Sequence, residues 1–282
     1  MSANAASLVP SRERGWQMGL GNMLAKENGA WWRTRRWWVQ CLLWLIVLNG
    51  LMALAIKSVE SEPEVALEPR ASISGPLMES AAITGLIVFV AIAGIAVPIA
   101  AISMGQDSIL GERHSGTAAW VLSKPISRPA FILAKLIALG LGFLATGVVL
   151  PGAIAYLEVT AFGGAQLSWL AFSGAMGLVF LNLLFYLTLA LMLGALFHGR
   201  GPVLGITLGL LLGYQLILQL APWLAAVMPW TLVGSAGQDG LPLAGLLALG
   251  QPLPTVAPII ATALWCVLFV AVAIWRFRRE EF

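Results

Sequence analysis

Long, uninterrupted apolar runs constrain this chain more than any other feature. Six of them reach or approach the roughly 20 residues that a helix needs to cross the hydrocarbon core of a bilayer. The chain is 59% hydrophobic and only 10% charged, whereas a soluble domain carries about 25% charged residues. Because the runs are continuous and not alternating, they predict helices, not barrel strands. We therefore expect an all-α integral membrane protein, one transmembrane domain over 1–282, with six transmembrane helices at 38–56, 81–103, 131–157, 168–197, 202–221 and 257–275.

The basic residues predict the orientation of these spans. If the N-terminus is cytoplasmic, all of the 16 lysines and arginines except Lys57 and Arg70 fall on the inner side. Such a bias is typical of the positive-inside rule, and the even number of spans then places both termini in the cytoplasm. We expect a prokaryotic cytoplasmic (inner) membrane. The net charge of +3 reflects this topology and attraction to lipid, and it does not indicate nucleic-acid binding.

The segment before the first span, 11–37, predicts an interfacial amphipathic helix. Trp16, Leu20, Met23 and Leu24 fall on one helical face. The string WWRTRRWW follows, and its tryptophans and arginines suit the lipid headgroup region. An ordinary juxtamembrane anchor with no further role remains an alternative. The charged and aromatic residues that we assign to this helix and its contact with membrane lipids are Trp16, Lys26, Glu27, Arg33, Arg35 and Arg36.

Residues 222–256 form a second irregular region. Five prolines and the string GSAGQDG interrupt it, and its apolar pieces are too short to cross a membrane. An additional span here would place the basic C-terminus outside, against the charge rule. We therefore expect short re-entrant outer helices between the fifth and sixth spans.

Few residues suggest catalysis or metal binding. Cys41 and Cys266 both fall within predicted spans, where cysteine acts as a small apolar residue. His114 and His198 are the only histidines, and neither has a metal-ligating partner at helical spacing. We expect no enzymatic activity, no metal site and no cofactor on this chain.

The most informative segment is a charged loop, 106–128, between the second and third spans. Gly116–Thr117 is expected to end one helix and to cap the next. A short helix over 118–123 then presents Trp120, Val121 and Leu122, and Pro125 ends it. An apolar group on a short cytoplasmic helix is costly on a free surface, which favours a docked partner. A helix that merely lies on the membrane is the alternative.

These residues resemble the cytoplasmic loop of type-2 ABC transporter permeases. The family loop typically reads as an acidic residue, Gly-Thr, a short apolar stretch, Ser-x-Pro, an apolar residue, Ser-Arg and a Lys on the next helix. The matching positions are Glu112, Gly116, Thr117, Leu122, Ser123, Pro125, Ile126, Ser127, Arg128 and Lys135. Lys26–Glu27 before a basic cluster is similar to the family's opening. Two departures are Ala118–Ala119–Trp120, in place of Leu-Glu and aliphatic residues, and Asn28–Gly29, which interrupts the opening helix.

The resemblance implies a membrane permease subunit of an ATP-binding cassette transporter, in an exporter-like complex. Its partners would be a cytoplasmic ABC ATPase dimer and a second permease, identical or homologous. ATP and Mg would bind the ATPase, in agreement with the absence of a G-x-x-x-x-G-K-[ST] phosphate loop in this sequence. The loop would contain the coupling helix, and the residues that would carry ATPase coupling are Glu112, Gly116, Thr117, Ala118, Trp120, Val121, Leu122, Ser123, Pro125 and Arg128.

The transport path is weakly marked. The spans hold polar residues but no charge pair at mid-membrane depth, which disfavours an ion-coupled secondary carrier and suits a lipid-like or amphipathic substrate. A non-transporting subunit that relays ATPase motion to an outer or membrane-bound partner is the main alternative. Candidate path residues are Asn49, Asn182, Tyr186, Gln215 and Gln219.

Overall fold

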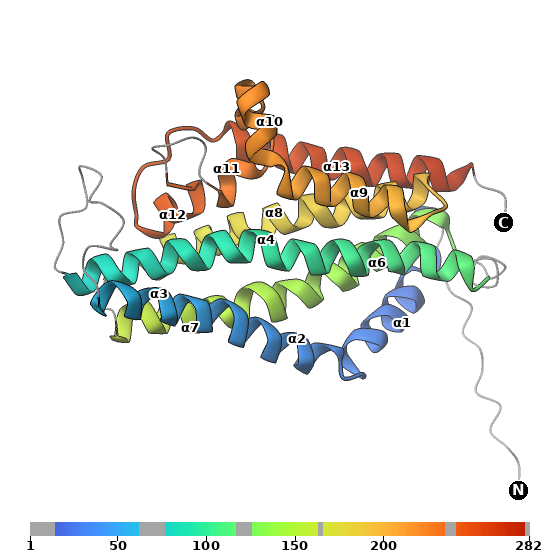
Figure 1. Cartoon of the computed structure of the whole chain (residues 1–282). Helices are drawn as coiled ribbons and strands as arrows, with labels where there is room; N and C mark the ends of the chain where they lie inside the picture. The colour runs from blue at the N-terminus through green and yellow to red at the C-terminus, as the bar shows by residue number, and fades with distance from the viewer. Residues whose placement is uncertain (1–14, 62–76, 117–125, 163–165, 235–240, 280–282) are drawn as a thin grey trace, which may run out of the picture.

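The computed structural model describes residues 15–61, 77–116, 126–162, 166–234 and 241–279. Within these ranges the chain forms helices and connecting turns and no strand. The long helices lie side by side along a common direction (Figure 1). The predicted all-α architecture is confirmed.

The N-terminal part is a short helix followed by the first long one. The 3-10 turn η1 (Gly15–Gln17) precedes α1 (Leu20–Trp32). Then α2 (Arg36–Trp44), the π-helical turn η2 (Leu45–Asn49) and α3 (Gly50–Ser61) form a continuous rod. Our expectation that Asn28–Gly29 interrupts the opening helix is wrong, because α1 runs through both residues and packs along α6. The turn of η1 instead separates Trp16 from the face that Leu20 and Met23 share.

The second long helix extends well past its apolar run. Helix α4 (Leu77–His114) has 38 residues, which corresponds to about 57 Å at 1.5 Å per residue. A hydrocarbon core is about 30 Å thick, so α4 projects beyond it. The helix continues from the predicted span end at 103 to His114, and the first part of the predicted loop is therefore helical.

The third and fourth long helices form the centre of the bundle. Helix α6 (Arg128–Phe143), the π-helical η4 (Leu144–Val149), α7 (Leu150–Leu157) and the π-helical η5 (Glu158–Phe162) make one rod. Helix α8 (Trp169–Leu196) carries no charged residue and packs against α4, α12 and α13. Its most apolar window is 72% buried, against 22% for α13. A helix that is apolar on all sides is expected at the centre of a bundle.

The predicted fifth span is broken. Helices α9 (Arg200–Leu212) and α10 (Tyr214–Leu220) are bent by 68° at Gly213. A Cβ at Gly213 would lie 2.6 Å from the Gly209 carbonyl oxygen, so the bend requires glycine. The indole Nε1 of Trp230 donates to the Leu210 carbonyl. In an unbroken helix this carbonyl would accept from the amide of Tyr214. The predicted fifth span over 202–221 is therefore built from two helices, and whether the bent pair crosses the membrane as one span stays a prediction.

The remaining elements are short, apart from the last. They are η6 (Pro222–Ala226), α11 (Trp230–Val233), α12 (Leu243–Ala248) and the long α13 (Ala257–Arg278). Helices α11 and α12 pack against α8, and whether they re-enter the membrane stays a prediction. By length and composition, the described residues hold five helices able to cross a membrane, or six if the bent α9–α10 pair is one span.

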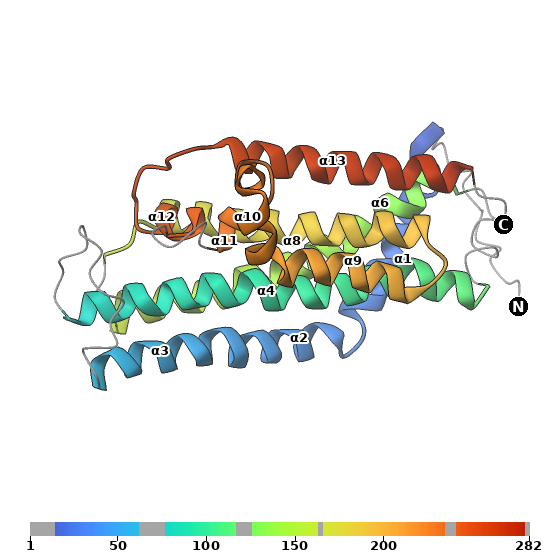
Figure 2. The same ribbon diagram turned by 45° about the horizontal axis from the view of Figure 1, so that its top comes forward.

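One end of the bundle gathers basic residues. The end of α4, the start of α6, the start of α9 and the end of α13 lie together at the right of Figure 1. Figure 2 shows the same grouping from another side, with α13 and α2–α3 on opposite flanks. This end is the one that we expect to face the cytoplasm, and we refer to it as the inner end.

Candidate functional site

The structure describes both sides of the predicted coupling helix but not the helix itself. Glu112 lies in the last turn of α4, Gly116 follows two residues after the end of that helix, and Arg128 begins α6. The site is therefore built from the two flanks, which we call the base of the loop. The predicted coupling residues that lie outside the described residues are Thr117, Ala118, Trp120, Val121, Leu122, Ser123 and Pro125.

Four charged side chains join three helices at the base of the loop. The Lys135 ammonium lies 3.0 Å from a Glu27 carboxylate oxygen and 3.1 Å from a Glu112 oxygen. The Lys26 ammonium lies 2.7 Å from the same Glu112 oxygen and 3.7 Å from that of Glu27. Two carboxylates and two ammonium groups therefore connect α1, the end of α4 and α6. We call these residues the Lys135 cluster.

Three of the four side chains of the Lys135 cluster are largely buried. The Lys135 side chain is 1% exposed, and those of Glu27 and Glu112 are 16% and 17% exposed. The ammonium of Lys135 also lies 4.8 Å from the centre of the Phe131 ring, a cation–π contact. A buried charge is tolerated only when it is paired. The two carboxylates therefore hold Lys135 in place, and Lys135 holds α1 against α6.

The downstream flank is fixed by backbone contacts to η1 and α13. The Ser127 amide donates to the Met18 carbonyl at 2.9 Å, and the Ser127 hydroxyl donates to the Trp16 carbonyl. The same hydroxyl accepts from the Ala130 amide and so caps α6. The Arg128 guanidinium donates to the Phe277 and Arg278 carbonyls at the end of α13. The start of α6 is thus tied to both ends of the described chain.

The upstream flank is fixed to the end of α8. Arg113 donates to the carbonyls of Gly194, Ala195 and Phe197 at 2.9, 3.1 and 3.2 Å. The last carbonyls of a helix have no partner within the helix, and a cation there satisfies them. Each flank of the loop is therefore clamped to a different long helix.

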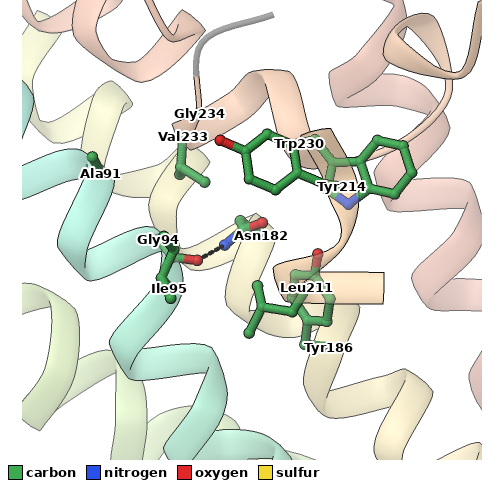
Figure 3. A pocket seen from close by; sticks show the side chains of 10 residues that line it. All are labelled: Ala91, Gly94, Ile95, Asn182, Tyr186, Leu211, Tyr214, Trp230, Val233 and Gly234. Carbon is green, nitrogen blue, oxygen red and sulfur yellow. Dashed lines mark hydrogen bonds between the residues drawn. The ribbon is translucent and has the colours of Figure 1, made fainter. Parts of the chain in front are cut away.

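Two of the predicted path residues lie together, in a pocket lined by α4, α8, α9, α10 and α11. Asn182 and Tyr186 project from α8, and the Asn182 amide donates to the Gly94 carbonyl of α4 at 3.0 Å (Figure 3). The Tyr186 hydroxyl faces the indole of Trp230 but has no hydrogen bond of standard geometry among the described residues. The pocket has a volume of about 40 Å³, enough for a few water molecules. Its lining also includes Ala91, Ile95, Leu211, Tyr214, Val233 and Gly234.

The other predicted path residues lie elsewhere. Asn49 is buried and donates to the Pro151 carbonyl at 3.1 Å, where the first rod meets α7. Gln215 and Gln219 are exposed on α10. Tyr214, which the path prediction did not select, lines the pocket because the bend at Gly213 brings it next to Trp230.

Comparison with known proteins identifies the family of this chain. The sequence model of the family described as "ABC-2 family transporter protein" matches residues 22–282. The chain belongs to the ABC-2 family. It is 27% identical over 213 residues to a probable ABC transporter permease protein NosY of Pseudomonas aeruginosa, covering 65% of this chain and 75% of that protein. It is also 27% identical over 209 residues to the protein of the same name from Stutzerimonas stutzeri, with the same coverages.

Membership of the ABC-2 family makes the chain an integral membrane permease of an ABC transporter. Such permeases associate with an ABC ATPase, and the permease is typically not itself catalytic. Among the described residues no group of three or more His, Cys, Asp or Glu side chains is arranged to hold a metal ion. The carboxylates of the Lys135 cluster are neutralised by the ammonium groups of Lys26 and Lys135.

Sequence reasoning missed the pairing within the Lys135 cluster. It selected Lys26, Glu27, Glu112 and Lys135 separately, as matches to an opening and to a loop. Nothing in their spacing indicates that they meet, because they come from three helices separated by 86 and 108 residues. A charge in the middle of an apolar helical face was the available signal: Lys135 stands in FILAKLIAL, where an unpaired lysine is not expected.

Proposed function

We propose that this permease converts the motion of a partner ATPase into the movement of a lipid-like or amphipathic substrate across the membrane. The 117–125 segment would dock on the ATPase through Trp120, Val121 and Leu122. ATP and Mg²⁺ would bind on the ATPase, and the direction that we propose is export. The family assignment and the clamped base of the loop support this proposal.

The observation that carries the proposal is the Lys135 cluster. A docking helix transmits force only if its two ends are fixed to rigid elements. Here Glu112 fixes the end of α4, Lys135 fixes α6, and both hold α1 through Glu27 and Lys26. Displacement of the loop would therefore move three helices together instead of bending a flexible linker.

The proposed assembly has two permeases, identical or homologous, and an ATPase dimer. We propose a prokaryotic cytoplasmic membrane with both termini and the base of the loop in the cytoplasm. Support comes from the gathering of Arg113, Arg128, Arg200 and Arg278 at the inner end, where each is placed by α4, α6, α9 or α13. Such an accumulation of basic residues is typical of the cytoplasmic side.

The proposed path runs past Asn182 and Tyr186. A pocket for a ligand of drug-like size usually measures about 300 Å³ or more, and the pocket here measures about 40 Å³. This conformation therefore leaves no room for an amphipathic molecule at that point. We propose that it is a closed state, and that α9, α10 and α11 move away from α8 when the path opens.

The test begins with purification of the chain from its native membrane and identification of the ATPase bound to it. The complex, reconstituted in proteoliposomes, is compared with the variant Glu112→Gln/Lys135→Gln and with a matched exposed pair, Asp107→Asn/Arg200→Gln. Asp107 and Arg200 pair at 2.6 Å near the same end, with side chains 60% and 57% exposed. We expect the first variant to bind the ATPase but to lose stimulation of ATP hydrolysis, and the second to behave as wild type. The proposal is wrong if no ABC ATPase copurifies, or if both variants couple normally.

A further inference from the structure

The turn between α1 and α2 carries a concentrated group of arginines and tryptophans that the proposed function does not use. Thr34 builds the turn: its hydroxyl donates to the Ala30 carbonyl at 2.9 Å and accepts from the Arg36 amide at 3.3 Å. The side chains around it are exposed on both sides of the turn. We call this set the basic turn, and it consists of Trp32, Arg33, Arg35, Arg36, Trp37 and Trp38.

One contact to α4 gives the depth of the basic turn along the bundle. Gln40, one helical turn past Arg36, reaches Met104 of α4 with its side-chain nitrogen 3.9 Å from the sulfur. At Met104 the apolar run of α4 ends and Gly105, Gln106 and Asp107 begin. The basic turn therefore lies where the apolar surface gives way to polar surface, which is the level of lipid headgroups.

The basic turn has no internal neutralisation among the described residues. None of its three guanidinium groups forms an ion pair there, and the acidic residue nearest in sequence, Glu27, is engaged by Lys135. Three exposed positive charges within four residues repel one another unless an anion lies between them. Arginine binds phosphate oxygens in a two-pronged geometry. The indole rings of Trp32, Trp37 and Trp38, which are 41%, 40% and 41% exposed, are suited to the boundary between tails and headgroups.

We propose that the basic turn is a binding site for the headgroup of an anionic phospholipid in the cytoplasmic leaflet. The assignment to the cytoplasmic leaflet rests on the orientation given under the proposed function. The arguments from charge and from the aromatic residues do not depend on that orientation. Anionic lipid attracts each nearby arginine with a strength that corresponds to roughly fivefold in affinity. A neutral, zwitterionic headgroup offers the same phosphate without the net charge, so a preference for anionic lipid over zwitterionic lipid is the signature of this site.

Helix α1 connects this site to the base of the loop. At one end Gly19, with φ of 77°, lies against Ile126. In the middle Glu27 pairs with Lys135, and at the other end Trp31 is buried against Gly142 and Phe143. An anionic headgroup that holds the basic turn would therefore also hold α1 in its contact with α6. We expect bound anionic lipid to stabilise the Lys135 cluster.

The experiment measures lipid binding by the purified full chain without any ATPase, so a failure of the coupling proposal would not affect it. Dioleoylphosphatidylglycerol and dioleoylphosphatidylcholine are titrated separately, and bound lipid is counted by native mass spectrometry. The variant Arg33→Gln/Arg35→Gln/Arg36→Gln is compared with Arg276→Gln/Arg278→Gln/Arg279→Gln. The second variant removes the same charge from α13, on the opposite flank of the same end (Figure 2).

We expect wild type to bind the anionic lipid at least tenfold more tightly than the zwitterionic lipid. The basic-turn variant is expected to lose most of this preference, and the α13 variant to keep it. Retention of the full preference by the basic-turn variant, or an equal loss in both variants, would overturn the proposal. If the triple variant does not insert, the single variants Arg33→Gln, Arg35→Gln and Arg36→Gln replace it. Each should lower the preference by up to about fivefold. If all three single variants keep the wild-type preference, the proposed site is wrong.

Discussion

Lys135 and Glu27 lie 108 residues apart in the sequence and form an ion pair of 3.0 Å between α6 and α1. The ammonium is almost completely buried, and it contacts Glu112 as well. Because Glu112 stands four residues before the end of the described part of the loop, and Lys135 stands two turns into the next helix, this lysine links both flanks of the predicted coupling helix. It also fixes to them a helix that precedes the first span.

Removal of the Lys135 ammonium tests the importance of this link. Lys135→Met keeps most of the side-chain volume but leaves Glu27 and Glu112 with Lys26 alone. Breaking a buried ion pair by removing one partner costs about 3–5 kcal/mol, and we expect roughly 3 kcal/mol because the carboxylates keep some contact with water. The measurement is thermal unfolding of the purified protein, and we expect the midpoint to fall clearly below that of wild type.

The control for this prediction is Arg200→Gln. Its partner Asp107 is more than half exposed, and exposed pairs contribute about 0–1 kcal/mol. The triple variant Glu27→Gln/Glu112→Gln/Lys135→Met should recover part of the loss, because it leaves no buried carboxylate without a counter-charge. Equal midpoints for Lys135→Met and Arg200→Gln would show that the cluster is not a structural link.

The packing of α1 on α6 gives a second prediction, at Gly142. A Cβ there would lie 2.4 Å from the Trp31 ring, and Trp31 is 2% exposed. Gly142→Ala should therefore displace α1 and lower stability by about 1–3 kcal/mol, as other overpacked cores do. Gly140→Ala is the matched control, because its Cβ would meet Leu184 at an ordinary 3.7 Å. Alanine favours helix over glycine, so the control should be neutral or more stable in thermal unfolding.

The sequence predicts the long helices well because a membrane leaves few alternatives. A run such as WLAFSGAMGLVFLNLLFYLTLALMLGAL can satisfy its backbone groups in lipid only as a helix, and α8 follows it from Trp169 to Leu196. The ends of helices outside lipid are less constrained. Helix α4 continues to His114 because residues such as Arg113 find hydrogen-bond partners on α8. These partners cannot be read from the sequence of α4 alone.

The base of the loop could be predicted by its residues but not by its geometry. Lys26, Glu27, Glu112 and Lys135 were each identifiable, yet their meeting depends on how α1 folds back along α6. The bend at Gly213 was missed for a related reason. The glycine is compatible with a straight helix, and it is the indole of Trp230, 20 residues along the chain from Leu210, that satisfies the freed carbonyl.

Removal of the buried Tyr186 hydroxyl tests whether this residue acts in transport or only in folding. The hydroxyl has no hydrogen bond of standard geometry to another described residue, and its pocket of about 40 Å³ has room for water that can satisfy it. Tyr186→Phe therefore removes no hydrogen bond within the described residues and should change the thermal midpoint little. If Tyr186 contacts the substrate, transport should fall at unchanged stability. In contrast, Tyr156→Phe should lower stability by about 1 kcal/mol, because the Tyr156 hydroxyl donates to the Leu167 carbonyl at 3.1 Å. Unchanged transport by Tyr186→Phe removes this residue from the proposed path.

The predicted coupling helix gives the last prediction. Trp120 lies outside the described residues, and the described flanks on either side of it are held by contacts of Glu112, Arg113, Ser127 and Arg128. Truncating an interface anchor of this kind costs about 2 kcal/mol or more, so Trp120→Ala should weaken ATPase binding by roughly 30-fold or uncouple hydrolysis from transport. Insertion and thermal stability should not change, since the cluster is intact. Trp223→Ala, at a 69% exposed tryptophan of η6, is the matched control. If Trp120→Ala assembles, hydrolyses ATP and transports as wild type does, the docking role of this helix is wrong.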